Sequence, residues 1–286
     1  MCNRKSIAQS PHAILKYMEL FDPIILALVQ GITEFLPISS TGHLILIREW
    51  LSLDTSNTLA YILVLHVATI AAVVTYFWSD ILVLIQVLLR KLSRLPVNER
   101  DLTLAYALLL GTIPAALIGF LIEPYVSAYP QSPALVAGMV FTASVFFMYV
   151  EWRYLLRPTH ESVSVRNGFW VGCFQVLALV PGFSRTGATI AGGMLLGLSR
   201  YEATRFSFLL AIPMTLVSGG INLISLLKNN GIVDWNPIIV GGVVAYVAAL
   251  IVIHLFLSFI RRYTLWPFIW YGVILSGLIG YITFVS

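Results

Sequence analysis

Residues 30–43, which read QGITEFLPISSTGH, place a polar cluster inside a stretch that is otherwise apolar. The cluster contains the carboxylate of Glu34, the hydroxyl of Ser40 and the imidazole of His43. Enzymes use these three groups for nucleophilic attack and for proton transfer. Each of them is costly to bury without a partner, so their concentration here indicates a functional site.

A second cluster at residues 181–189, PGFSRTGAT, contributes a cation. Arg185 keeps its positive charge at physiological pH, and its planar guanidinium matches the oxygens of a phosphate group. Gly187 allows the backbone to approach a ligand closely. The two clusters together predict an anion site flanked by groups that could do chemistry.

The composition decides the environment of these clusters. Of the 286 residues, 59% are hydrophobic and 10% are charged, whereas a soluble domain has roughly 25% charged residues. The chain therefore requires lipid as its solvent, and we predict an all-α integral membrane protein. The net charge of +4 comes from separate basic clusters between apolar runs, so it does not indicate nucleic-acid binding.

Six apolar runs are long enough to cross the hydrocarbon of a bilayer. They lie near 58–79, 103–122, 134–151, 206–227, 237–258 and 266–285. Residues 23–52 and 168–198 differ, because each holds two shorter apolar stretches broken by Pro, Gly, Ser and Thr. Such breaks at membrane depth must be buried in protein or line a wet cavity. We therefore predict about six transmembrane helices plus two re-entrant helical hairpins.

The basic residues suggest how these elements are oriented. The connections 80–102 and 152–167 are rich in Arg and Lys, whereas 53–57 and 123–133 have none. Placing the basic connections in the cytoplasm makes the first hairpin enter from outside and the second from the cytoplasm. The basic residues of the N-terminal segment conflict with this orientation, which the other connections support.

The two hairpins resemble each other at an offset of 145 residues. Gln30, Ser39, Thr41 and Gly42 match Gln175, Ser184, Thr186 and Gly187 in the printed sequence. With opposite directions of insertion, this match predicts an inverted-topology repeat whose tips meet near the midplane. We expect an N-terminal tail or interfacial helix at 1–21 and one polytopic domain at 22–286. Its repeats would cover about 22–151 and 168–286, and the half-helix N-termini at the tips would attract an anion.

At this point a resemblance is evident. QGITEFLPISSTGH and PGFSRTGAT resemble the two signature motifs of the bacterial undecaprenyl-diphosphate phosphatases, the bacitracin-resistance membrane phosphatases. The resemblance extends from about residue 22 over nearly the whole chain. It implies hydrolysis of undecaprenyl diphosphate to undecaprenyl phosphate and phosphate, which recycles the carrier lipid for peptidoglycan synthesis and confers bacitracin resistance. It also implies a multi-pass protein of the bacterial cytoplasmic membrane, with its site facing the outer side.

The motifs carry site residues over to this chain. We expect Arg185 to hold the phosphoryl oxygens, Ser40 to attack the terminal phosphorus or position water, and Glu34 and His43 to share proton transfer. The sequence leaves serine and water open as the nucleophile. The expected substrate-binding residues are Gln30, Ser39, Thr41, Gly42, Ser184, Thr186, Gly187 and Thr189.

A diphosphate substrate is expected to involve Mg²⁺ or Ca²⁺, with Glu34 as a candidate ligand. The family motif allows Glu or Gln where this chain has Gln30, and a neutral amide is a poorer ligand than a carboxylate. We therefore expect a cation carried in with the diphosphate, and no organic cofactor. The expected partners are the polyprenyl diphosphate and membrane lipids; a homodimer is left open, and nucleic acid is excluded.

Other interpretations remain at this stage. A secondary transporter would also have an inverted repeat and an anion site at the midplane, and the fold could in addition move the lipid phosphate across the bilayer. Glu34 and Arg185 could form a structural ion pair. His66 and His254, each alone in an apolar run, are interpreted as structural contacts between helices.

Overall fold

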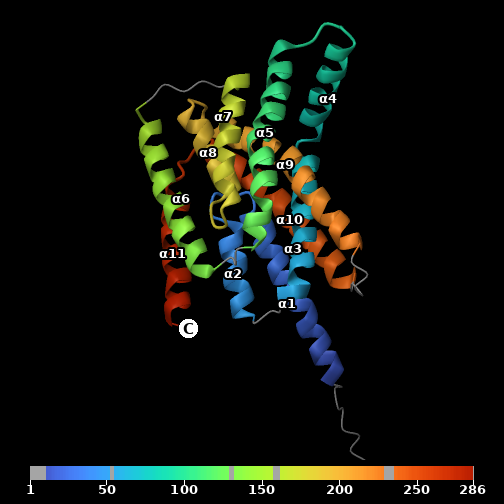
Figure 1. Cartoon of the computed structure of the whole chain (residues 1–286), viewed down its shortest axis with the longest axis vertical. Coiled ribbons are helices and arrows are strands. Elements are labelled where there is room, and N and C mark those ends of the chain that lie inside the picture. Colours follow the sequence, from blue (N-terminus) through green and yellow to red (C-terminus); the bar gives the residue numbers. More distant parts are fainter. Residues whose placement is uncertain (1–10, 52–54, 129–131, 157–161, 229–234, 286) are drawn as a thin grey trace, which may run out of the picture.

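The computed structural model describes residues 11–51, 55–128, 132–156, 162–228 and 235–285; the side chains of 11–20, 55–60, 123–128, 217–228, 235 and 285 lie outside the description. Over these residues the chain is helical and has no strand, as predicted (Figure 1). The first part contains α1 (Pro11–Thr33), α2 (Ser40–Trp50), α3 (Thr55–Tyr76), α4 (Trp78–Leu92), α5 (Glu99–Ala128) and α6 (Pro133–Tyr154). The second contains α7 (Val165–Gln175), the 3₁₀ turn η1 (Val176–Leu179), α8 (Arg185–Leu195), α9 (Arg200–Lys228), α10 (Trp235–Ile260) and α11 (Trp266–Val285).

Five of the six predicted runs each lie within one helix, in α5, α6, α9, α10 and α11, whereas the run 58–79 is divided between α3 and α4 by a break at Phe77. By length and apolarity, α5, α6, α10 and α11 can each cross a membrane, and α3 with α4 forms a fifth candidate bent by 76°. The side chains of the second half of α9 lie outside the described residues. The chain is therefore a multi-pass membrane protein. The division at residue 21 stays a prediction, although α1 runs continuously from Pro11 past it.

The two predicted hairpins are present and enter from opposite ends of the molecule. In Figure 1, α1 and α2 occupy the lower half and α7 and α8 the upper half, and their turns meet near the middle. Thr186 Oγ1 donates to the backbone oxygen of Glu34 at 3.0 Å, and Ser184 Oγ contacts the backbone oxygen of Leu36 at 3.5 Å. These contacts join two turns that are about 150 residues apart in the sequence.

Each hairpin packs on a helix of the other half. The first arm α1 lies along α10, and α7 lies along α5 in the equivalent way, while α6 pairs with α11 and α3 with α9. Small residues allow these crossings. A Cβ on Gly31 would lie 2.7 Å from the backbone oxygen of Ala245, and a Cβ on Gly172 would overlap the backbone oxygen of Gly111. The pairing agrees with an inverted repeat whose halves are interleaved.

A buried ion pair lies at the other end of the second hairpin. Glu151 on α6 is fully buried and lies 2.8 Å from Nη2 of Arg200, which is the first residue of α9. The same carboxylate accepts from the backbone N–H of Leu265 at 3.2 Å, and the Arg200 guanidinium lies over the Tyr154 ring. The pair fixes the start of α9 relative to α6 and to the connection before α11.

Candidate active site

Glu34 is the centre of the contacts between the two turns. Its Oε1 accepts from Nη2 of Arg185 at 2.6 Å. Its Oε2 accepts from Nε2 of Gln30 at 2.8 Å and from Oγ of Ser40 at 2.9 Å. The side chain is 7% exposed, so this carboxylate is desolvated and depends on these donors. Gln30 reaches it because residues four apart share a helix face, as predicted.

Arg185 is held from two sides. It is the first residue of α8, and its Nη1 donates to Oγ1 of Thr215 on α9 at 2.7 Å while Nη2 donates to Glu34. The side chain is 21% exposed, so part of the guanidinium faces open space. The remaining N–H groups can bind a phosphate oxygen without reorientation of the fork.

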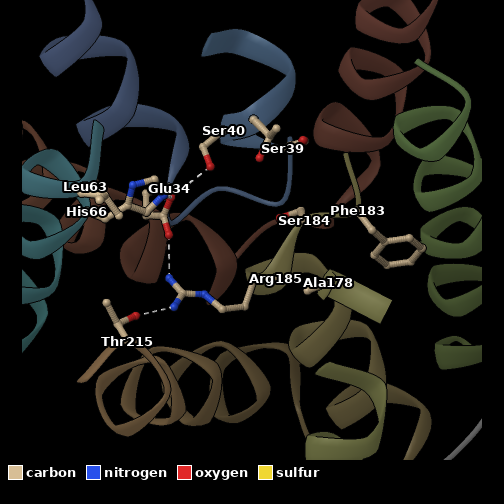
Figure 2. A pocket seen from close by; sticks show the side chains of 11 residues that line it. Glu34, Ser39, Ser40, Leu63, His66, Ala178, Phe183, Ser184, Arg185 and Thr215 are labelled. Carbon is tan, nitrogen blue, oxygen red and sulfur yellow. Dashed lines mark hydrogen bonds and ion pairs between the residues drawn. The ribbon is translucent and has the colours of Figure 1, made fainter. Parts of the chain in front are cut away.

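A cavity of about 310 Å³ lies between the two turns (Figure 2). Six residues selected from the motifs line it: Glu34, Ser39, Ser40, Thr41, Ser184 and Arg185. Helices α3 and α9 and the η1 turn complete the wall with Leu63, His66, Thr215 and Ala178, and Phe183 adds a ring. The polar side chains thus converge on one cavity from both halves of the chain, which the sequence predicted for the two motifs.

Two helix N-termini begin at this cavity. Ser39 precedes α2, and its Oγ accepts from the N–H of Gly42 at 3.3 Å; Ser184 precedes α8, and its Oγ accepts from the N–H of Gly187 at 3.1 Å. These caps fix the first turn of each helix and leave earlier N–H groups for a ligand. Ser39 has a φ of 66°, a costly conformation outside glycine that is typical of functional turns. Both helix dipoles therefore favour an anion here.

His43 lies apart from the cavity. Its Nδ1 is 2.8 Å from the backbone oxygen of Ser39, and its Nε2 is 2.6 Å from the hydroxyl of Tyr271 on α11, on which the ring stacks. It lines a second, apolar cavity together with Pro267 and Phe268. Both ring nitrogens are engaged, so the geometry supports a role in holding the Ser39 turn. We predicted that His43 shares in proton transfer, but none of its contacts in the structure supports this role.

The remaining motif residues pack the turns instead of lining the cavity. A Cβ on Gly187 would overlap the ring of Phe147, so this glycine allows α8 to approach α6. Gly42 is buried beside α6 and α11. Thr189 Oγ1 lies 2.5 Å from Oγ of Ser207 on α9. For these three positions the structure indicates support of the site at a distance from any ligand.

Two cavity residues were not selected from the sequence: His66, which was interpreted as a structural contact between helices, and Thr215, which was not considered. Both belong to helices far from the motifs in the sequence. His66 had a detectable signal, because an ionisable residue inside an apolar run is by default a candidate for function. Thr215 had none, since threonine is common in membrane helices and its contact with Arg185 depends on the packing of α9.

The donor set does not fit a divalent cation held by the protein. Over the described residues, no three His, Cys, Asp or Glu side chains gather closely enough to hold a metal ion. Glu34 is the one carboxylate that lines the cavity in the part of the chain that the structure describes, and both of its oxygens accept from Arg185, Gln30 or Ser40. A hard cation prefers six or more oxygen ligands, so this carboxylate alone is an inadequate site.

Two comparisons show which known proteins this chain resembles. The family model of the bacitracin resistance protein BacA matches residues 23–278. Undecaprenyl-diphosphatase 2 of Stutzerimonas stutzeri is 38% identical over 267 residues, which cover 92% of this chain and 97% of the relative. The undecaprenyl-diphosphatase of Alteromonas mediterranea is 37% identical over 268 residues, covering 93% and 100%. That of Nitrosococcus oceani is 36% identical over 265 residues, covering 93% and 99%.

Proposed function

Because the chain belongs to the family of the bacitracin resistance protein BacA, we propose that it is an undecaprenyl-diphosphatase that works in the cavity between the two hairpin turns. It hydrolyses undecaprenyl diphosphate to undecaprenyl phosphate and phosphate, recycles the carrier lipid for peptidoglycan synthesis, and confers bacitracin resistance. The observation that supports this site is the Glu34 carboxylate, which accepts from Ser40 on one oxygen and from Arg185 on the other.

Arg185 and the N-termini of α2 and α8 bind the terminal phosphate. The guanidinium supplies a fixed charge, and the free N–H groups supply donors that need no reorganisation during the reaction. Phosphoryl transfer needs mainly positioning and stabilisation of spreading negative charge, which these groups provide. Gln30 keeps Glu34 in place from within α1.

Ser40 is the nucleophile and Glu34 is its base. Ser40 Oγ attacks the terminal phosphorus, the bond from that phosphorus to the bridging oxygen breaks, and undecaprenyl phosphate leaves. The hydroxyl proton passes to Oε2 of Glu34, which is 2.9 Å from Oγ in the unliganded site. Water then hydrolyses the phosphoserine. A transporter would need the charges of this cavity but not a hydroxyl donating to a carboxylate.

A divalent cation, Mg²⁺ or Ca²⁺, arrives with the diphosphate as part of the substrate. The protein lies in the bacterial cytoplasmic membrane with this cavity open to the outer side, which the basic connections at the opposite end support. All residues of the proposed site belong to one chain, so a homodimer, which the sequence leaves open, is not needed to complete it.

Phosphate release from undecaprenyl diphosphate by the detergent-purified protein tests this proposal. Ser40→Ala and Arg185→Ala should each lower turnover by about 10²-fold or more. Arg262→Ala, which removes an exposed arginine beyond α10, serves as the matched control and should keep the activity. A Ser40→Ala protein with most of its turnover would exclude the serine route. Activity retained by Arg185→Ala would exclude this cavity.

A further inference from the structure

His66 faces the cavity from α3, which neither motif includes. Its Nε2 lies 3.6 Å from Oε2 of Glu34, and its side chain is 37% exposed. Figure 2 shows His66 and Arg185 on two sides of the Glu34 carboxylate, so the imidazole borders the space that the terminal phosphate would occupy. A purely structural contact between helices does not explain this position of His66.

The backbone fixes which nitrogen of His66 faces the cavity. Nδ1 lies 2.9 Å from the backbone oxygen of Ile62, and because an oxygen of this kind accepts, Nδ1 carries the proton. In the neutral ring Nε2 then has a lone pair. Glu34 Oε2 already accepts from Gln30 and Ser40, and 3.6 Å is too long for a hydrogen bond with His66. The lone pair is therefore available to a proton donor in the cavity.

The chemistry of the second half-reaction requires such an acceptor. In the first half-reaction Glu34 receives the proton of Ser40, so it cannot accept a second proton from water. His43 offers no substitute, because its Nε2 is engaged by the Tyr271 hydroxyl and it does not line this cavity. Among the described residues at the cavity wall, His66 is the side chain with a basic nitrogen left to accept a proton.

We propose that His66 is the general base that activates water for hydrolysis of the phosphoserine, an inference that rests on the proposed function. The water oxygen forms a bond to phosphorus while one of its protons passes to Nε2 of His66. The bond from phosphorus to Ser40 Oγ breaks, and Oγ takes back the proton held by Glu34. Phosphate leaves, and the imidazolium releases its proton to water, which restores the resting site.

The test is the amount of phosphoserine that accumulates during turnover. The full-length protein in detergent is mixed with undecaprenyl diphosphate labelled with ³²P at the terminal phosphate, quenched in acid, and counted for label on the protein. His66→Gln and His66→Asn are compared with wild type and with His254→Gln. His254 is the matched control, because it lies on exposed α10 surface and contacts Tyr76 instead of the cavity.

Loss of a general base should slow steady turnover by about 10²-fold or more. Both His66 variants should nevertheless release about one undecaprenyl phosphate per chain in a fast first turnover and retain the label on Ser40. Wild type and His254→Gln should show neither the burst nor the label. The burst counts competent sites, so a correctly folded variant is recognised in the same experiment.

Two results would overturn the assignment of His66: steady turnover close to wild type in both variants, or slow turnover with no burst and no label. Failure of the proposed function is a separate result. It would appear as absence of phosphate release from the wild type, or as undiminished turnover after Ser40→Ala.

Discussion

At the scale of single residues, the Arg185 guanidinium depends on two neighbours of different charge. Glu34 neutralises it, whereas Thr215 orients it without competing for its charge. An incoming phosphate must share the guanidinium with Glu34, and only the Thr215 contact is unaffected by this competition. We therefore expect Thr215 to be a positioning residue for phosphate binding in the proposed reaction.

Thr215→Val, which preserves shape and removes the hydroxyl, should reduce kcat/KM by about 10-fold, the value of one hydrogen bond to a charged group. Thr215→Ser should restore most of the activity because it keeps the oxygen. Steady-state kinetics on the three proteins gives the comparison. Equal kcat/KM for the valine and serine variants would show that the contact does not matter.

The sequence identified the residues of this site that lie in the two motifs, and it failed where the contact depends on distant parts of the chain. Glu34, Ser40 and Arg185 converge as predicted, because two broken helices must bring their tips to one place. The orientation of His43 is set by Tyr271, which is 228 residues further along. His66 and Thr215 join the cavity through the packing of α3 and α9, which no local pattern specifies.

At the scale of elements, glycines set how closely the hairpins approach their partner helices. The crossing of α7 and α5 has backbone against backbone at Gly168, Gly172 and Gly111, where a Cβ on Gly172 has no space. This crossing holds the second turn at the depth of the first. The position of Arg185 is thus a consequence of small residues more than ten positions away.

Gly172→Ala should destabilise the protein by about 1–3 kcal/mol, since backbone atoms must move to accept the methyl group. Gly138→Ala is the matched control: Gly138 lies in α6 with nothing within 4 Å of its Cβ position. Thermal unfolding of both variants in detergent measures the difference. A Gly172→Ala protein with the same unfolding temperature as the wild type would refute the close crossing of α7 and α5.

Apolar runs predicted where helices occur, but not where they bend. The run 58–79 was expected to be one span, and it is broken at Phe77, where α3 turns by 76° into α4. Most of α4 falls in the connection 80–102. Arg90 and Lys91 lie in its last turn. Leu84 and Val87 are buried in the core, and this packing explains why the chain stays helical after the bend.

At the scale of the whole molecule, the Glu151–Arg200 pair connects the end of α6, the start of α9 and the connection before α11. Its carboxylate is fully buried. Glu151→Ala would leave an unpaired guanidinium that is only 16% exposed, and should cost about 3–5 kcal/mol of stability. Glu99→Ala, at an exposed position in the first turn of α5, is the control. Chemical or thermal unfolding checks the contrast, and equal stability of the two variants would contradict it.

The orientation in the membrane has its own test. Trp50 at the end of α2 and Leu95 between α4 and α5 are both exposed. The end of α2 and the connection between α4 and α5 lie at opposite ends of the molecule (Figure 1). In a Cys2→Ser, Cys173→Ser background, Trp50→Cys in intact cells should react with a membrane-impermeant maleimide and Leu95→Cys should not. The reverse labelling would place the first hairpin on the cytoplasmic side.

The interleaved packing also constrains how the protein is made. As the chain leaves the ribosome, α1 lacks its main partner until α10 has been synthesised, and α5 must wait for α7. The glycine-bearing face of α1 is thus exposed to lipid, or to an insertion chaperone, through most of translation. Neither half constitutes a folding unit, yet two separately expressed halves carry complementary surfaces and should assemble in the bilayer into a working enzyme.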